Sequence, residues 1–158
     1  MAVERAPVTA FVALGANLGD ATAAVSRAMG DLDALPGTQV TARSHLYRSA
    51  PVDASGPDYV NAVARLSTRL TAPDLLAALQ QLEQRAGRQR PHRNAPRTLD
   101  LDLLLYGDAR IDSPRLTLPH PRMLARAFVL QPLAEIEPQR VSAAALAAVA
   151  GQRIERLG

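Results

Sequence analysis

The 158-residue chain contains no cysteine and no lysine. Without cysteine, a disulfide framework, a thiolate metal site and a cysteine nucleophile are all excluded. Without lysine, there is no Schiff-base lysine and no P-loop lysine, and all 18 cationic side chains are arginines. Every cationic contact to a phosphate therefore comes from a planar guanidinium, which can bind two oxygens at once.

Aromatic side chains and long apolar runs are also scarce. The chain has three Tyr, two Phe and no Trp, too few for the stacking platforms of a general single-strand nucleic-acid binder. The longest nearly apolar stretch, residues 141–150, is too short to span ~30 Å of hydrocarbon, and the amino terminus lacks the apolar segment of a signal peptide. We therefore expect a cytoplasmic protein that binds neither a membrane nor nucleic acid.

The composition is that of a globular protein, with 47% hydrophobic and 21% charged residues. The length fits one domain, because single domains usually contain roughly 100–200 residues. No internal repeat or linker divides the sequence. We expect a single domain over residues 1–158, and we expect a monomer.

Hydrophobic periodicity predicts the order strand, helix, strand, strand, helix, strand. Apolar or alternating stretches predict strands at residues 8–14, 38–47, 59–67 and 99–106. Helical spacing predicts one helix capped by Asp20 that stops before Pro36, and a second helix capped by Thr71 that ends at Gly87. A short hairpin at 108–118 and helices at 121–133 and 141–150 follow. The order βαββαβ predicts an α+β fold, a ferredoxin-like antiparallel sheet with its helices on one face, plus a C-terminal hairpin and helices.

Residues 93–107, RNAPRTLDLDLLLYG, place two carboxylates inside a leucine-rich strand. Side chains alternate along a strand, so Asp100 and Asp102 share one face with Leu104 and Tyr106. The opposite face then carries Leu99, Leu101, Leu103 and Leu105. The two Asp Cα atoms lie ~6.6 Å apart, close enough for their carboxylates to converge on shared cations. Such oxygen ligands suit Mg²⁺, which takes one or two carboxylates and completes its shell with water and phosphates.

Two simpler interpretations of this acid pair are open. The acids can lie on a solvated strand face, or they can form salt bridges with Arg88, Arg90, Arg93 and Arg97. However, leucines flank both acids, which favours a central strand where an acid needs a partner. Four arginines also carry more charge than two carboxylates require, which favours an anionic ligand that arrives with its metal.

Four sequence blocks occur in a fixed order along residues 8–136. They are ALGANLGD (13–20), PDYVNAV (57–63), RNAPRTLDLDLL (93–104) and LTLPHPRMLARAFVLQPLAEI (116–136). Together they resemble the 6-hydroxymethyl-7,8-dihydropterin pyrophosphokinases of folate biosynthesis. The resemblance implies transfer of pyrophosphate from ATP, the co-substrate, to the hydroxymethyl oxygen of the reduced pterin. It also implies AMP as leaving group and two Mg²⁺ ions as cofactors.

The resemblance further implies roles for individual residues. Asp100 and Asp102 would hold the metal ions, and Arg88 and Arg97 would be the catalytic arginines that contact the transferred group. The implied ATP-binding residues are Gln80, Glu83, Arg90, Leu103, Arg115, Thr117, His120 and Arg126. The implied pterin-binding residues are the stacking pair Tyr59 and Phe128, the amide of Asn61, and Gly15, Ser49 and Val52.

Some of these residues also have plain structural interpretations. Gln80 can be an exposed helix amide, and Phe128 can be an ordinary core residue. Many family members have Trp-Gly before the Pro-Arg pair, whereas this chain has Asn94-Ala95, so aromatic packing from that position is absent. The loops at 48–57 and 87–97 are rich in Pro, Gly and Arg, and we expect them to act as lids.

Two other functions compete with the pyrophosphokinase. An RNA-binding module fits a ferredoxin-like sheet and the arginine content, but the sheet lacks an aromatic triad at RNA-recognition spacing. Two acids on a central strand would also repel phosphates unless a metal intervenes. A nucleotide-sensing domain could bind MgATP without catalysis, but it would have no need for Tyr59, Asn61 and Phe128 together.

Overall fold

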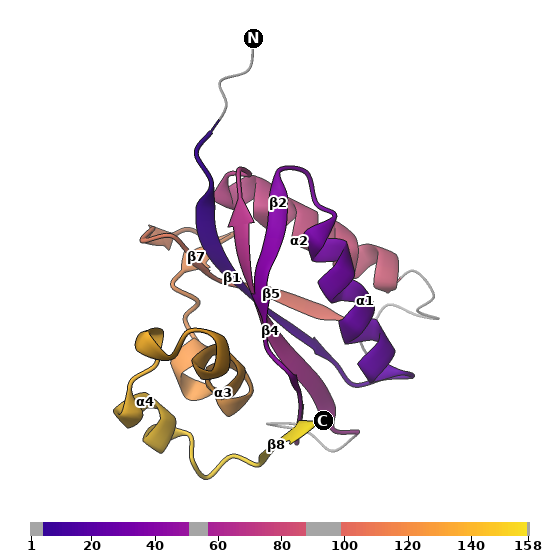
Figure 1. Ribbon diagram of the computed structural model, residues 1–158, viewed down its shortest axis with the longest axis vertical. Coiled ribbons are helices and arrows are strands. Elements are labelled where there is room, and N and C mark those ends of the chain that lie inside the picture. Colours follow the sequence, from indigo (N-terminus) through magenta and orange to yellow (C-terminus); the bar gives the residue numbers. More distant parts are fainter. Residues whose placement is uncertain (1–4, 51–56, 88–98, 158) are drawn as a thin grey trace.

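The computed structural model describes residues 5–50, 57–87 and 99–157 (Figure 1). Its main sheet has the strand order β5-β1-β4-β3-β8, with β2 paired to the same edge of β4 as β3. These strands are β1 (Val8–Ala16), β2 (Thr38–Arg43), β3 (Leu46–Ser49), β4 (Tyr59–Thr68), β5 (Asp100–Tyr106) and β8 (Ile154–Leu157). All neighbouring pairs are antiparallel. The fold is therefore a mixed α/β fold with an antiparallel sheet.

The helices α1 (Ala21–Asp33) and α2 (Ala72–Ala86) cover one face of the sheet (Figure 1). Both predicted caps are confirmed. The Asp20 side chain accepts a hydrogen bond from the Ala23 N–H, and the Thr71 side chain accepts one from the Asp74 N–H. Each cap satisfies a helix N–H group that has no partner within the helix.

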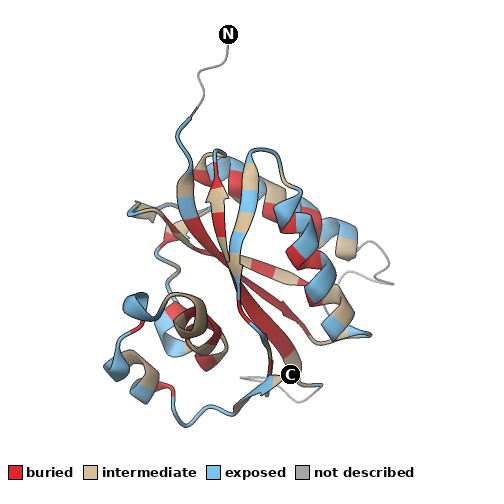
Figure 2. Ribbon diagram, in the orientation of Figure 1, coloured by how far each residue is buried: buried red, intermediate tan, exposed pale blue. Residues whose placement is uncertain are grey.

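Apolar residues fill both sides of the sheet. As a consequence, β1 is buried on both faces from residue 10 to residue 16 (Figure 2). A strand buried on both faces reads as a continuous apolar run, as β1 does. One cluster lies under α1 and α2 and includes Val12, Leu14, Val25, Leu32, Ala64, Leu66, Leu75 and Leu79. The second cluster lies under α3 (Ala127–Ile136) and includes Phe11, Val63, Leu104, Leu130 and Leu133. The helices α1 and α2 of the βαββαβ unit therefore share one face, and the added C-terminal helix α3 covers the other.

Two irregularities correct the predicted strands. The single strand predicted at 38–47 is two strands, interrupted where Ser44 forms hydrogen bonds with the backbone of Val63 through its own N–H and its hydroxyl. In β5, Phe11 pairs with Leu105 and Val12 with Leu103, so Leu104 is an extra residue in a β-bulge. The bulge reverses the alternation beyond it. Tyr106 packs in the α1 and α2 cluster and Leu105 in the α3 cluster, opposite to the prediction.

The C-terminal third differs most from the prediction. The hairpin is present as β6 (Ile111–Asp112) and β7 (Thr117–Leu118), followed by a 3₁₀ turn, η1 (Met123–Ala125). Consequently α3 begins at Ala127 and not at residue 121. After a second 3₁₀ turn, η2 (Pro138–Arg140), the predicted final helix is short, α4 (Ala143–Ala148), and the strand β8 was not predicted. Over residues 5–50, 57–87 and 99–157, none of the helices has the length and apolar content that crossing a bilayer requires.

Candidate functional site

A row of paired residues crosses the sheet on the face that α3 covers. Asp100 on β5 pairs with Gly15 on β1, Gly15 pairs with Asn61 on β4, and Asn61 pairs with Tyr47 on β3. Directly paired residues of antiparallel strands project to the same face. Two strand spacings separate the Asp100 and Asn61 Cα atoms by roughly 10 Å. Between them, Gly15 contributes no side chain, and a Cβ there would lie 3.0 Å from Asn61 Nδ2. The row therefore has a flat floor between an acid and an amide.

Asp102 lies one position further along the same face, opposite Ala13. Its side chain is 43% exposed, and its nearest described cation is Arg126, whose Nη1 lies 4.0 Å from Asp102 Oδ2. The bulge comes after Asp102, so the common direction predicted for the two acids is present. Both carboxylates lie where a ligand from solvent can reach them, since each residue is only partly buried.

A cavity of about 240 Å³ adjoins Asp102 where β5 meets the β6–β7 hairpin. It brings together five residues predicted from the sequence, namely Asp102, Leu103, Arg115, Thr117 and His120. The carbonyl oxygen of the bulged residue Leu104 accepts a 2.9 Å hydrogen bond from the backbone N–H of His120, which lines the cavity. Hairpin and strand are thereby joined beside the acid pair.

The imidazole of His120 is oriented by its neighbours. Its Nδ1 accepts a 3.1 Å hydrogen bond from the Arg122 N–H, so a neutral ring carries its proton on Nε2. Burial lowers the pKa of His120 below 6.5; Asp102 acts in the opposite direction, while Arg126 and Arg122 lower it further. At neutral pH the ring is therefore an uncharged donor at Nε2.

Gln80 and Glu83 lie on the side of α2 that faces β5. Leu76 lines the cavity, and Gln80 follows it by one helical turn. Gln80 is exposed, which agrees with the simpler interpretation of this residue as an exposed helix amide. Glu83 Oε2 accepts a 2.8 Å hydrogen bond from the Leu101 N–H, so this carboxylate connects α2 to the strand that carries both acids.

Three of the predicted pterin residues, Ser49, Tyr59 and Asn61, lie together at the other end of the row. The Ser49 hydroxyl donates a 2.6 Å hydrogen bond to Asn61 Oδ1, and both side chains are buried. This bond fixes which way the Asn61 amide points. Tyr59 pairs with Ser49 on the same face and is partly buried. Phe128 is also partly buried, and the Arg126 guanidinium lies 5.3 Å from its ring centroid, within cation–π range.

Four predicted site residues fall outside the described residues. These are Val52, Arg88, Arg90 and Arg97, together with most of the two predicted lids. Arg93, Asn94 and Ala95 also lie outside the described residues.

Sequence reasoning missed a cluster that holds α3 against the sheet. Glu135 on α3 accepts hydrogen bonds from the Tyr47 hydroxyl at 2.7 Å and from the His45 backbone N–H at 3.1 Å, and it contacts His45 Nδ1 at 2.8 Å. Burial and the Glu135 carboxylate raise the pKa of Tyr47 to about 12. Burial acts to raise the pKa of Glu135, but the bonds from Tyr47 and His45 outweigh it and lower that pKa. The partners are about 90 positions apart, so no local sequence pattern could reveal them.

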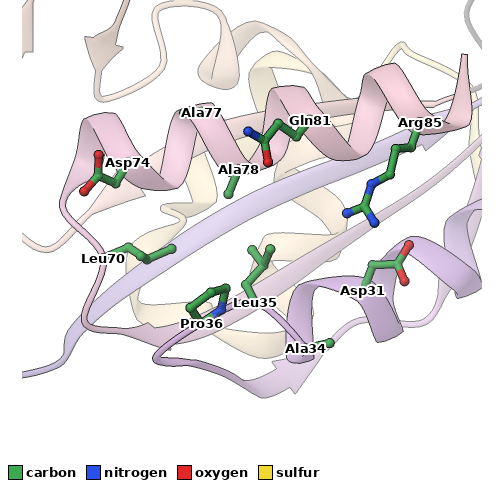
Figure 3. Close-up of a pocket in the computed structure, with 10 residues that line it drawn as sticks. All are labelled: Asp31, Ala34, Leu35, Pro36, Leu70, Asp74, Ala77, Ala78, Gln81 and Arg85. Atoms are coloured by element: carbon green, nitrogen blue, oxygen red, sulfur yellow. The ribbon is translucent and has the colours of Figure 1, made fainter. Parts of the chain in front are cut away.

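A larger cavity, about 500 Å³, lies between α1 and α2 (Figure 3). Asp31 and Arg85 point toward one another across it, above an apolar floor that includes Leu35 and Leu70 (Figure 3). Among the described residues, none of those predicted for ATP, metal or pterin lines this cavity.

Comparison with known proteins gives consistent results for sequence and structure. Residues 11–138 match the family model described as 7,8-dihydro-6-hydroxymethylpterin-pyrophosphokinase (HPPK). The 2-amino-4-hydroxy-6-hydroxymethyldihydropteridine pyrophosphokinase of Pseudomonas aeruginosa is 49% identical over 129 residues, which cover 81% of this chain and 80% of that protein. The enzyme of the same name from Synechocystis is 44% identical over 84% of this chain and 68% of that protein.

Among solved structures, a crystal structure of wild-type Plasmodium falciparum HPPK-DHPS with pterin and p-hydroxybenzoate superimposes with a TM-score of 0.63 at 12% identity. The superposition covers 87% of this chain but only 41% of that longer polypeptide. At this identity, the likeness concerns the fold alone.

Proposed function

Because this chain belongs to the HPPK family, we propose that it transfers pyrophosphate from ATP to the hydroxymethyl group of 6-hydroxymethyl-7,8-dihydropterin, a step of folate biosynthesis. The observation that carries this conclusion is the match over residues 11–138, together with 49% identity to a curated pyrophosphokinase across most of both chains. The RNA-binding and nucleotide-sensing alternatives have no comparable support.

We propose that Asp100 and Asp102 hold two Mg²⁺ ions. Among the described residues, no group of three or more His, Asp or Glu side chains could enclose a metal ion. Two carboxylates suffice for Mg²⁺, because ATP phosphates and water can supply the remaining ligands. The donor set therefore fits, since both acids share one face and are partly exposed. Bound Mg²⁺ would neutralise the phosphates and favour the deprotonated form of the attacking alcohol.

We propose that the cavity beside Asp102 takes the ATP. His120 can donate from Nε2 to a phosphate or to the nucleoside, and Arg115 and Thr117 line the same cavity. Arg126 can contact the phosphates from the opposite side, beside Asp102. Gln80, Glu83, Arg90 and Leu103 complete the proposed ATP set. Displacement at the β-phosphorus needs alignment and neutralisation and no protein nucleophile. Arg88 and Arg97 are proposed to stabilise the transferred group.

We propose that the flat floor at Gly15 takes the pterin. The ring has a hydrogen-bonding edge and two apolar faces, so it suits an amide and aromatic side chains. Asn61, held by Ser49, can pair with that edge, and Tyr59 and Phe128 can stack on the faces. Val52 is proposed to contact the ring as well. Pterin at Gly15 would lie one strand away from Asp100, where the alcohol could meet the ATP phosphates.

We also propose that the fold has a ferredoxin-like arrangement. The strand order β5-β1-β4-β3 with intervening helices α1 and α2 supports a ferredoxin-like arrangement. The single domain over residues 1–158, the monomeric state and the cytoplasmic location stay predictions from the sequence.

An AMP-release assay tests the function and the metal assignment together. With ATP, Mg²⁺ and 6-hydroxymethyl-7,8-dihydropterin, the wild-type protein should form AMP, and omission of the pterin or the metal should abolish it. Asp100→Asn and Asp102→Asn should each slow turnover by on the order of 100-fold or more, because each removes a charged metal ligand without changing side-chain size.

Asp31→Asn is the matched control, because Asp31 is an exposed acid on the other side of the sheet, and its turnover should equal that of the wild type. AMP formation without the pterin would contradict the proposed reaction. Unchanged turnover in both Asp100→Asn and Asp102→Asn would contradict the metal assignment alone.

A further inference from the structure

The start of α3 carries two proposed substrate contacts but has no cap of its own. Arg126 is the N-cap residue, in an extended conformation, and its side chain makes no capping hydrogen bond. That side chain instead lies 4.0 Å from Asp102 and over the ring of Phe128. Helix-start N–H groups need acceptors from elsewhere. Whatever supplies the acceptor also determines where the Arg126 backbone lies.

Gln152 supplies the missing cap from 25 positions further along the chain. Its Oε1 accepts a 2.9 Å hydrogen bond from the Ala127 N–H, and its Nε2 donates a 2.8 Å hydrogen bond to the Ala125 carbonyl oxygen. Only one orientation of the amide satisfies both bonds. The two bonds hold the backbone on both sides of Arg126, which lies between these two residues.

Gln152 is itself fixed by the residues around it. Its backbone N–H donates to the Val149 carbonyl oxygen at 3.0 Å, and Val149 is buried in the α3 cluster. Two positions later, Ile154 pairs with Ser49, whose hydroxyl orients Asn61. Arg153 forms a 3.1 Å ion pair with Asp58, the residue before Tyr59. Residues 152–154 therefore connect the start of α3 to the pterin side of the sheet.

We propose that Gln152 is a positioning residue of the pyrophosphokinase site. Its amide sets the placement of Arg126 against Asp102 and of Phe128 against the sheet, without itself touching a substrate. The proposal rests on the proposed function, because it assigns Arg126 to ATP and Phe128 to the pterin. Gln152 lies outside residues 11–138, the part of the chain that matches the family model.

The test compares Gln152→Ala with Ser142→Ala. Ser142 caps α4 in the same C-terminal segment, accepting a 3.0 Å hydrogen bond from the Ala145 N–H, so both variants remove a helix cap. Gln152→Ala should raise the KM for ATP by on the order of tenfold, because Arg126 loses its fixed backbone, while kcat changes less. It should also speed amide hydrogen exchange at Ala127. Ser142→Ala should lower the melting temperature similarly and leave KM unchanged.

Gln152→Glu refines the test, and it carries the test if Gln152→Ala does not fold. The carboxylate keeps an acceptor for the Ala127 N–H but loses the donor to Ala125, so the rise in KM should be smaller than for Gln152→Ala. An unchanged KM for ATP in the folded Gln152 variants would overturn the proposal. An equal rise in Ser142→Ala would also overturn it, because the effect would then be general destabilisation. Failure of the wild-type protein to form AMP would instead refute the proposed function.

Discussion

Single side chains in this site have their orientation set by close partners. The Ser49 hydroxyl fixes the amide of Asn61, and the Arg122 N–H fixes the tautomer of His120. Such preorganisation matters for phosphoryl-type transfer, because positioning and electrostatics supply most of the catalysis. A side chain that is already oriented before substrate arrives loses less entropy on binding.

The lowered pKa of His120 predicts a stability change near neutral pH. Between the folded-state pKa and 6.5, the unfolded chain binds the proton more readily than the folded one, so stability falls as pH drops through 6.5. In His120→Asn this fall should be smaller, since asparagine does not titrate and can still accept from the Arg122 N–H. Urea unfolding of both proteins at pH 7.5 and pH 5.5 measures the difference. Equal losses in the two proteins would contradict the role assigned to burial of His120.

Among the elements, α3 is the one whose attachment shapes the site, because it carries Arg126 and Phe128 and packs on β3 and β4. Two side chains, Glu135 and Gln152, attach it to the sheet and to the C-terminal segment. The Glu135 carboxylate binds Tyr47 and His45, and Gln152 caps its first turn. Loss of either attachment should therefore displace the proposed pterin-stacking residue.

Glu135→Gln tests the attachment of α3 through its pH dependence. The pKa of Glu135 is lowered in the folded protein, so its contribution is present above 4.5 and is lost as pH falls through the folded-state pKa. The variant should lose about 1–2 kcal/mol at pH 7, since two charge-assisted hydrogen bonds become neutral ones. Below pH 4.5, urea unfolding should also show a shallower fall of stability with pH in the variant than in the wild type.

The control for that experiment is Glu155→Gln, because Glu155 is an exposed acid on β8. Its unfolding free energy and its pH dependence should match those of the wild type. A Glu135→Gln protein as stable as the wild type at pH 7 would show that the Tyr47 and His45 contacts do not hold α3.

Elements with local signals could be predicted from the sequence. Asp20 and Thr71 cap helices within three residues of themselves, and the common face of Asp100 and Asp102 needs only a two-residue period. Features that depend on distant partners could not be predicted. The bulge at Leu104 reverses Leu105 and Tyr106, and the start of α3 is set by Gln152 after an intervening 3₁₀ turn. The acid pair was predictable because it is local, whereas the Glu83 contact that supports its strand spans 18 positions and the Glu135 contact that holds α3 spans 90.

At the scale of the whole molecule, the proposed site takes residues from both faces of the sheet. The proposed acid and pterin residues lie on the face opposite the cluster under α1 and α2. The proposed ATP set, however, includes Gln80 and Glu83 on α2 and Leu103 of that cluster. Figure 2 shows that both faces of the sheet carry buried residues. The proposed site also takes residues from β1, β3, β4, β5, the β6–β7 hairpin and α3. The site therefore depends on the complete fold, and no single segment contains it.

The most direct test of this account is a crystal structure of the protein with Mg²⁺, a non-hydrolysable ATP analogue and the pterin. The account predicts carboxylate oxygens of Asp100 and Asp102 about 2.0–2.1 Å from Mg²⁺, with the triphosphate beside the cavity that Asp102 and His120 line. A structure with those oxygens free of metal, and with the triphosphate bound elsewhere, such as between α1 and α2, would contradict it.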